Sequence, residues 1–329
     1  MRLAGVNVLV TGAGGYLGSH LAEELVRRDA RVTALVHYRS DGSWGWLDHS
    51  ELAREMRVVA GDVRDSGLLR ILGWAFRPEA VFHLAALISI PYSHLAPEAF
   101  LQTNLLGTTN ILRLCRDWNA QLFLASTSEV YGTAQTPQMD EDHPLCPRSP
   151  YAASKLAADQ LALAYWRGYE LPVVLVRPFN SFGPRQSQRA AIPSFILQAL
   201  GGESVSLAHP ESRRDWTYVT DTVRGFILAA EADAVAGQVF NVATGRAVSV
   251  RQAAELVVSL VHPGLPVLVD PQRERPLPSE VTWLCGNAQR AEQQLGWRPE
   301  VSFEAGVQHA IDWFREHREL YHRTGAFQI

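Results

Sequence analysis

The chain has 329 residues, of which 47% are hydrophobic and 19% charged, and its formal net charge is −4. This composition is typical of a globular protein and excludes a disordered chain. The basic residues are scattered along the sequence, so we expect no cationic surface for nucleic acid.

The sequence shows no sign of a membrane or secreted protein. No apolar run approaches the roughly 20 residues that span a bilayer, and the first residues lack the apolar segment of a secretion signal. The three cysteines are too widely spaced for a metal site and too few for a disulfide framework: Cys115, Cys146 and Cys285. We expect a soluble, cytoplasmic protein without a metal ion.

Short apolar runs alternate with longer helical patterns in the first half of the chain. Strands are predicted over residues 6–10, 32–36, 57–60, 80–84, 121–125 and 173–176. Helices, with apolar residues three and four apart, are predicted over residues 17–28, 99–118 and 151–166. Right-handed crossovers between such units give an α/β fold, a doubly wound parallel Rossmann sheet with its ligand crevice at the carboxyl ends of the strands.

The composition of the sequence changes after Arg177 and Pro178, where loops rich in Pro, Gly and Arg begin. We predict a dinucleotide-binding domain over residues 1–178 and a smaller mixed α/β substrate-binding domain over residues 179–329. Residues 221–231 have a helical pattern and residues 238–242 a strand pattern. Segments around 221–245 are therefore candidates to rejoin the first sheet.

A glycine-rich loop directly follows the first predicted strand and opens the first helix. Gly12 permits the tight turn, Gly15 lets the backbone approach a pyrophosphate, and Gly18 lets helix and strand pack closely. Tyr16 and Leu17 begin the helix whose N-terminus faces the anion. In this strand, loop and helix context a dinucleotide site is favoured over a ligand-free turn.

The end of the second strand bears on the choice between NAD and NADP. A carboxylate there binds the ribose 2′-hydroxyl of NAD, whereas a basic residue accommodates the 2′-phosphate of NADP. His37 and Arg39 occupy this position, so Arg39 favours NADP, with a solvated surface arginine as the alternative. Asp62 and Val63 follow the third strand; Asp62 is a candidate partner of the adenine amino group or a cap of its own turn.

Two short segments carry the predicted chemistry. Tyr151 and Lys155 are four residues apart and share a helix face, so the ammonium together with a nicotinium charge is expected to lower the pKa of the phenol. Thr127 follows the strand at 121–125 and can hydrogen-bond the substrate oxygen. Glu129 has no task in plain alcohol oxidation, but a carboxylate can remove the acidic proton beside a new ketone. The alternative for Glu129 is a helix-capping or solvated loop residue.

Over nearly its whole length the sequence resembles the extended short-chain dehydrogenases/reductases that act on nucleotide sugars. Within that family it is most similar to NDP-sugar 4,6-dehydratases, including GDP-mannose 4,6-dehydratases and the dehydratases of legionaminic acid pathways. The resemblance rests on residues 11–18, 83–86, 104–110, 126–132, 151–155, 177–180, 183–187, 214–218 and 295–297.

The resemblance implies roles for individual residues. Thr127, Tyr151 and Lys155 form the catalytic set, with Glu129 as the C5 base and Ser128 beside it. Tightly bound NAD or NADP is recycled, and further cofactor contacts come from Leu84, Ala85 and Ala86. A nucleotide-diphosphate sugar is held by Asn180, Arg185, Arg214 and Arg275. Family members also commonly form homodimers through helices equivalent to residues 99–118 and 151–166.

One residue departs from the dTDP-glucose dehydratase pattern. Those enzymes usually place Asp before the glutamate, as an acid for the departing hydroxyl, whereas this chain has Ser128. The Thr-Ser-Glu form resembles GDP-sugar dehydratases and also UDP-glucuronate decarboxylases. The sequence therefore predicts an NDP-hexose 4,6-dehydratase, with decarboxylation and 4-epimerisation as alternatives that use the same C4 oxidation.

Overall fold

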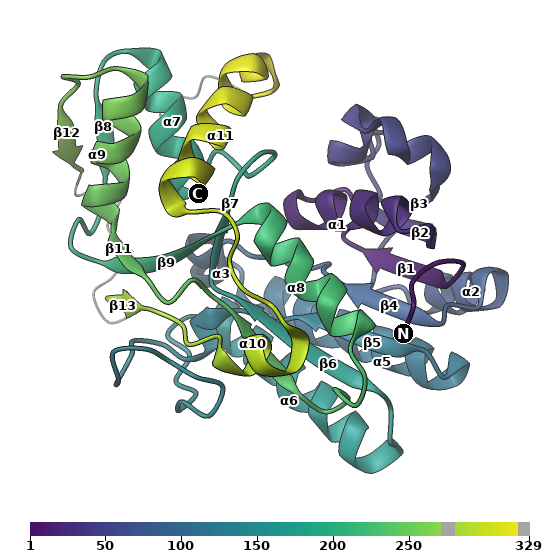
Figure 1. Cartoon of the computed structure of the whole chain (residues 1–329). Helices are drawn as coiled ribbons and strands as arrows, with labels where there is room; N and C mark the ends of the chain where they lie inside the picture. Colours follow the sequence, from purple (N-terminus) through teal and green to yellow (C-terminus); the bar gives the residue numbers. More distant parts are fainter. Residues whose placement is uncertain (271–279, 322–329) are drawn as a thin grey trace.

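The computed structural model describes residues 1–270 and 280–321. Its centre is a seven-stranded parallel sheet (Figure 1). In spatial order the strands are β10 (Val239–Val242), β6 (Val173–Pro178), β5 (Gln121–Ala125), β4 (Ala80–His83), β1 (Asn7–Thr11), β2 (Arg31–His37) and β3 (Arg57–Gly61). The strand order reverses between β1 and β4, which confirms the doubly wound α/β prediction and places the ligand crevice at that point.

Helices cover both faces of this sheet. The helices of this part are α1 (Tyr16–Arg27), α2 (Ser66–Phe76), α3 (Ile90–Leu95), α4 (Pro97–Phe100), α5 (Gly107–Trp118), α6 (Pro150–Tyr169) and α8 (Val219–Glu231). Alternate residues of the strands, such as Val10 and Leu9, belong to two hydrophobic clusters on opposite faces of the sheet. The first cluster contains residues of α1 and α8, and the second contains residues of α2, α5 and α6. Burial on both faces explains why these strands read as continuous apolar runs.

Smaller sheets lie to one side of the main sheet (Figure 1). In one, β9 (Arg213–Tyr218) pairs with β7 (Asn180–Phe182), β11 (Ala247–Ser249) and β13 (Trp283–Leu284); in the other, β8 (Val205–Leu207) pairs with β12 (Val267–Val269). The remaining helices are α7 (Ala191–Gly201), α9 (Val250–Val261), α10 (Gln289–Leu295) and α11 (Phe303–Glu316). Parallel and antiparallel pairings occur together, so this part is mixed α/β as predicted.

The strand β10 pairs with β6 at the edge of the main sheet, and α8 packs on the same face as α1. Residues 219–242 therefore rejoin the first sheet: β10 extends it, and α8 packs on one of its faces. We retain a domain boundary near residue 178 as a proposal.

The predicted helix over residues 99–118 is wrong in its first part. The structure has α4, then a π-helix over Leu101–Leu106, and only then α5. Asn104 in the π-helix is buried. Its side-chain amide is hydrogen-bonded to the backbone of Leu87 and to the hydroxyl of Ser154, at 2.8–3.0 Å. A wider turn is a common way of directing a side chain inward at a functional site. Here it ties the loop after β4 to helix α6.

Candidate active site

The structure brings together the residues predicted to be catalytic. Thr127 and Ser128 follow β5, and Glu129 lies in the short 3₁₀-helix η4 (Ser128–Val130). Tyr151 lies in the first turn of α6, which Ser149 caps by accepting the N–H of Ala152 at 3.1 Å. The Tyr151 hydroxyl is hydrogen-bonded to the Thr127 side chain and lies within the field of Glu129. All these side chains are buried except that of Glu129, which is half-buried.

Lys155 lies one turn after Tyr151 on α6. Its Nζ donates to the carbonyl oxygen of Ala125 at 2.5 Å, so the ammonium is held at the carboxyl end of β5. Burial lowers the Lys155 pKa, and the carboxylate of Asp159 opposes that shift. The lysine is therefore fixed in place beside the phenol by one strand end and one buried carboxylate.

The protein groups alone raise the pKa of Tyr151 to about 12, and the lowering expected with a nicotinium charge present stays a prediction. Burial is the main cause, the Thr127 hydrogen bond lowers the pKa, and the negative charges of Glu129 and Asp159 raise it further. The Lys155 ammonium donates to the Ala125 carbonyl at the same strand end. An added positive charge beside the phenol is needed to form the phenolate near neutral pH.

A network of buried polar groups supports the catalytic residues from behind. Asp159 accepts a hydrogen bond from Ser126 at 2.6 Å and pairs with Arg177 at 3.1 Å; both members of this pair are almost fully buried. Arg177 also donates to the Tyr131 hydroxyl at 3.0 Å, which donates to Asn241 at 2.8 Å. The network joins α6, β6, β10 and the strand end that carries Thr127. Sequence reasoning missed Asp159, although its position four residues after Lys155 was a usable signal.

Replacing Asp159 by Ala is expected to lower the free energy of unfolding by about 3–5 kcal/mol, because it leaves the Arg177 charge buried and unpaired. Replacing Glu304, whose pair with Arg246 is exposed, should cost at most about 1 kcal/mol. Urea unfolding of both variants measures the difference. Equal small losses would show that the buried pair does not hold this region together.

The glycine loop has the form that a pyrophosphate requires. Gly12 has φ +71°, and a Cβ on it would come within 2.7–2.9 Å of the backbone of Leu84 and Ala85. Helix α1 has Gly15 at its N-cap, with no side-chain cap and no acidic residue in its first turn. Its N-terminus is therefore free of protein anions, which fits a bound phosphate.

The structure places other predicted cofactor residues around this loop. Gly18 packs against the Gly12 carbonyl, and Leu17 is half-buried at the start of α1. The Tyr16 hydroxyl lies 3.2 Å from Ser181 on β7, so its side chain reaches toward the second part of the chain. Half-buried residues follow β4 at the same edge of the sheet: Leu84, Ala85 and Ala86.

The neutral His83 anchors the start of the glycine loop from inside the protein. Thr108 donates its hydroxyl proton to the Asn104 carbonyl at 2.6 Å, so it must accept from His83 Nε2 at 3.0 Å. His83 Nδ1 then accepts from Thr11 at 2.6 Å. Burial lowers the pKa of His83 to about 3, and the nearby Lys155 charge contributes to the shift. The imidazole is therefore an uncharged link between β1, β4 and α5.

The depressed pKa of His83 makes stability sensitive to acid. Because the folded-state pKa lies below the ordinary 6.5, this contribution is present above pH 6.5 and is lost as the pH falls toward 3. His83→Gln is expected to reduce the pH slope of the free energy of unfolding in that window by about 1.4 kcal/mol per pH unit. Urea titrations at several pH values between 3 and 6.5 measure this slope. An identical slope in wild type and His83→Gln would contradict the assignment.

At the predicted adenosine end, His37 and Arg39 are exposed, and Arg39 pairs with Asp41 at 2.9 Å. Asp62 accepts the N–H of Arg64 at 2.8 Å and pairs with its guanidinium, which lowers the Asp62 pKa. Asp62 thus caps its own turn, while its role toward adenine stays a prediction. Val63 beside it is buried.

The predicted substrate residues do not all converge. Asn180 pairs in register with Trp216 of β9, and its Oδ1 is buried with no partner among the described residues. Arg214 is buried and pairs with Glu280 at 2.9 Å. Arg185 instead pairs with Glu23 of α1 at 2.9 Å and donates to Ser19, so we do not propose it as a substrate ligand. Arg275 lies outside the described residues.

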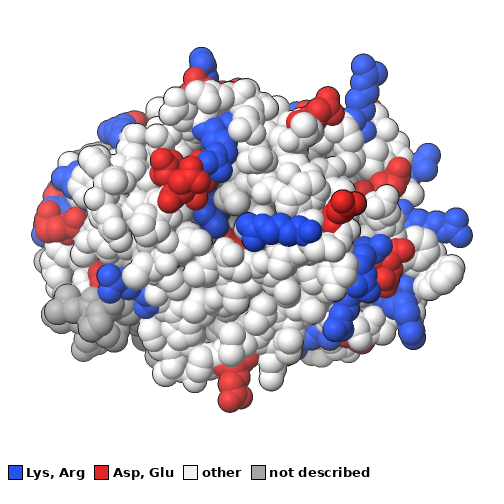
Figure 2. Space-filling view, turned by 90° about the horizontal axis from the view of Figure 1, so that it is seen from below, with Lys and Arg blue, Asp and Glu red and all other residues white. Residues whose placement is uncertain are grey.

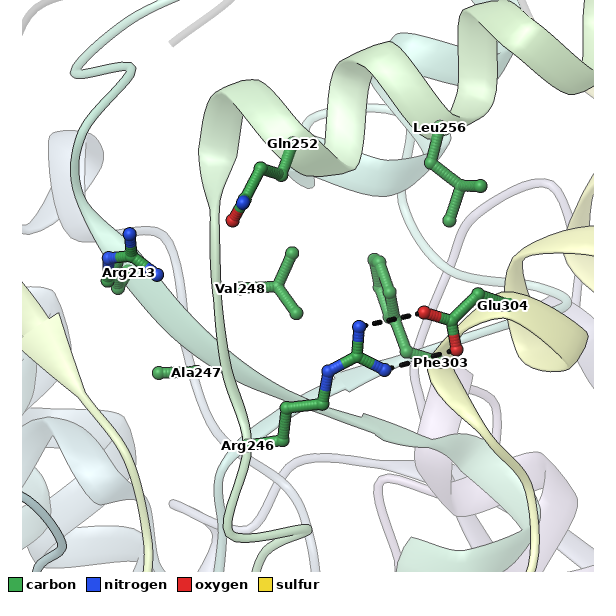
Figure 3. Close-up of a pocket in the computed structure, with 8 residues that line it drawn as sticks. All are labelled: Arg213, Arg246, Ala247, Val248, Gln252, Leu256, Phe303 and Glu304. Atoms are coloured by element: carbon green, nitrogen blue, oxygen red, sulfur yellow. Dashed lines mark hydrogen bonds and ion pairs between the residues drawn. The ribbon is translucent and has the colours of Figure 1, made fainter.

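A cavity of about 270 Å³ lies between β11, α9 and α11, lined by residues that include Arg213, Val248 and Phe303 (Figure 3). Arg246 and Glu304 form an ion pair at its rim. None of the predicted site residues lines this cavity, so it is separate from the candidate active site.

Within the described part of the chain, no helix is both long enough and apolar enough for a bilayer-spanning segment. Residues 1–270 and 280–321 also contain no group of three or more His, Cys, Asp or Glu side chains that could hold a metal ion.

The fold and the site together define a Rossmann-fold enzyme of the extended short-chain dehydrogenase/reductase class. The glycine loop and the buried Tyr151 and Lys155 pair lie at the carboxyl edge of one doubly wound sheet. The family model described as GDP-mannose 4,6 dehydratase matches residues 9–310. The chain belongs to this family of NAD-dependent nucleotide-sugar epimerases and dehydratases.

Relatives in this family carry out different reactions. A dTDP-glucose 4,6-dehydratase from Actinoplanes sp. is 32% identical, over 96% of this chain and 100% of the relative. The UDP-glucuronic acid decarboxylase 1 of Xenopus tropicalis is 31% identical, over 95% of this chain and 73% of the relative. The UDP-glucose 4-epimerase of Thermus thermophilus, solved with NAD, is 30% identical with a TM-score of 0.84, covering 94% of this chain and 99% of that one.

Proposed function

We propose that this protein is an NDP-hexose 4,6-dehydratase. The observation that carries the proposal is the charge of Glu129 acting on the Tyr151 hydroxyl, which is also hydrogen-bonded to Thr127. Oxidation of a sugar hydroxyl needs the phenol and the lysine, but elimination of water also needs a base for the neighbouring C–H. The Glu129 carboxylate is the residue that we assign as this base.

The residues divide the work as follows. Tyr151, as the phenolate, takes the proton of the C4 hydroxyl, and Lys155 stabilises that phenolate. Thr127 forms a hydrogen bond with the C4 oxygen. NAD(P)⁺, held at the glycine loop of Gly12, Gly15 and Gly18, would supply reversible hydride chemistry, so that no net oxidation would occur. Because the C4 ketone acidifies the adjacent C–H, Glu129 removes the C5 proton, and water leaves from C6. Ser128 supplies a hydroxyl beside Glu129, and Asn180 and Arg214 are proposed to hold the diphosphate sugar.

The competing reactions share the C4 oxidation and differ only afterwards. The decarboxylase and epimerase relatives show that this scaffold accommodates both. Decarboxylation needs an arginine at the substrate carboxylate, for which Arg214 is the candidate, and epimerisation needs no C5 base. Mass spectrometry of products from a panel of NDP-hexoses and UDP-glucuronate separates the three. Loss of one water supports the proposal, whereas loss of carbon dioxide or a product of unchanged mass overturns it.

We infer that Arg39 contributes to the choice between NAD and NADP. Its guanidinium is exposed after β2 and is only partly neutralised by Asp41, so a 2′-phosphate gains a charge-assisted partner there. Arg39→Ala is expected to weaken NADP⁺ binding about tenfold and to leave NAD⁺ binding almost unchanged. Titration calorimetry with both dinucleotides measures this. Equal losses for the two, or no loss, would remove Arg39 from the selectivity.

We also propose a homodimer built on α5 and α6. The exposed side of α6 carries uncharged residues such as Ala153, Gln160 and Ala164, and Leu101 and Leu106 before α5 are about half-exposed. Figure 2, viewed from the side where α6 lies in Figure 1, shows a broad area with few charged groups below the middle of the face. Sedimentation velocity should give a dimer; a monomer at micromolar concentration would contradict the assignment.

A further inference from the structure

The segment after β2, residues 43–46, packs directly against the phosphate loop. Trp46 donates its backbone N–H to the Gly14 carbonyl at 3.0 Å. A Cβ on Gly14 would collide with the backbone of Trp44, and a Cβ on Gly45, which has φ +69°, would collide with the Gly14 carbonyl. The two backbones therefore approach as closely as glycine permits. Any shift of residues 43–46 must move the loop that faces the pyrophosphate.

This segment is held rigid by its own hydrogen bonds. The carboxylate of Asp48 accepts the N–H of Trp44 at 3.1 Å and the hydroxyl of Ser43 at 2.6 Å. Ser43 in turn accepts the N–H of Gly45 at 3.0 Å. The turn thus has a single backbone arrangement that presents the Trp46 N–H to Gly14.

The side chain of Trp46 points away from the loop and joins the C-terminal helix. Its ring lies 5.6 Å from that of Trp313 on α11, nearly edge to face, and 5.8 Å from that of Tyr321. Tyr321 packs on the fully buried Phe314 and donates its hydroxyl to the carbonyl of Gln186 at 3.1 Å. The contacts therefore run from the phosphate loop through Trp46 to α11 and the loop after β7.

We propose that Trp46 is a positioning residue for cofactor binding: anchored by Trp313 and Tyr321, it holds residues 43–46, and through them Gly14, in the conformation that receives the dinucleotide diphosphate. The inference concerns cofactor affinity and holds whether the enzyme dehydrates, decarboxylates or epimerises its substrate. The physical basis is preorganisation: a loop that is fixed before binding loses less conformational freedom when the ligand binds, so the affinity is higher. Trp313, which lies on α11 away from the loop, then affects cofactor affinity without touching Gly14.

The test measures the dissociation constant of NAD⁺ by titration calorimetry for folded variants. Trp46→Ala and Trp313→Ala are each expected to weaken binding about tenfold, and the double variant no further, because both act through one contact. Trp46→Phe should restore affinity to within about threefold of wild type, since a ring again packs on Trp313. Trp74→Ala is the matched control, because Trp74 forms an edge-to-face pair with Trp118 that does not touch the phosphate loop.

Each outcome decides the proposal. Wild-type affinity in Trp46→Ala, even with a lowered melting temperature, reduces Trp46 to a packing residue. Additive losses in the double variant, or a tenfold loss in Trp74→Ala, also overturn the coupling. If Trp46→Ala does not fold, Trp313→Ala and Trp46→Phe still give the comparison. A wild-type protein that binds neither NAD⁺ nor NADP⁺ would refute this inference together with the cofactor assignment.

Discussion

Tyr151→Phe is expected to lower kcat by about 10²–10⁴-fold, because the phenol is the base that takes the C4 hydroxyl proton. The phenylalanine ring keeps the contact with Phe100, whose centroid lies 6.3 Å from that of Tyr151, so the fold and cofactor binding should persist. Steady-state rates and NAD⁺ affinity measure the two effects separately.

The control is Tyr165→Phe on the same helix, which should retain wild-type activity. Because burial raises the Tyr151 pKa and the base acts deprotonated, the wild-type rate should rise with pH on the acid side of its profile. A Tyr151→Phe variant within tenfold of wild type would exclude Tyr151 as the base.

Glu129→Gln is expected to abolish dehydration by a similar factor, about 10²–10⁴-fold, while C4 oxidation survives. The amide keeps the shape and hydrogen bonding of Glu129 but cannot accept the C5 proton. In deuterated water, the variant should show reduced bound nicotinamide by absorbance and no deuterium at C5.

Glu203→Gln, at an exposed carboxylate after α7, should behave as wild type. Full turnover to a 6-deoxy product by Glu129→Gln would remove Glu129 from the mechanism. Loss of C4 oxidation together with dehydration would instead assign it to substrate binding.

Local patterns predicted the sheet and the order of the candidate site residues along it. The strands lie within about two residues of their predicted positions because most are buried on both faces, the edge strand β3 excepted, and all are bounded by turn residues. Helical spacing placed Tyr151 and Lys155 on one face, and the strand end at Ala125 placed Thr127 and Glu129 beside them. These relations depend on residues close in sequence or on the edge of one sheet.

Contacts between distant segments were beyond sequence reasoning. Arg185 pairs with Glu23 of α1, and Asn104 of the π-helix reaches Leu87 and Ser154. Burial and the charges of Glu129 and Asp159 raise the Tyr151 pKa, against the lowering by the Thr127 hydrogen bond. Such balances of charge and desolvation require the folded distances.

The most direct test of the proposed dehydration follows the hydrogen at C4. An NDP-hexose that is turned over, carrying deuterium at C4, is incubated with wild-type enzyme, and NMR locates the label in the product. The proposal predicts deuterium at C6 of a 4-keto-6-deoxy sugar, because the hydride removed from C4 returns to C6. Label found again at C4, in an epimer or a decarboxylated pentose, would contradict it.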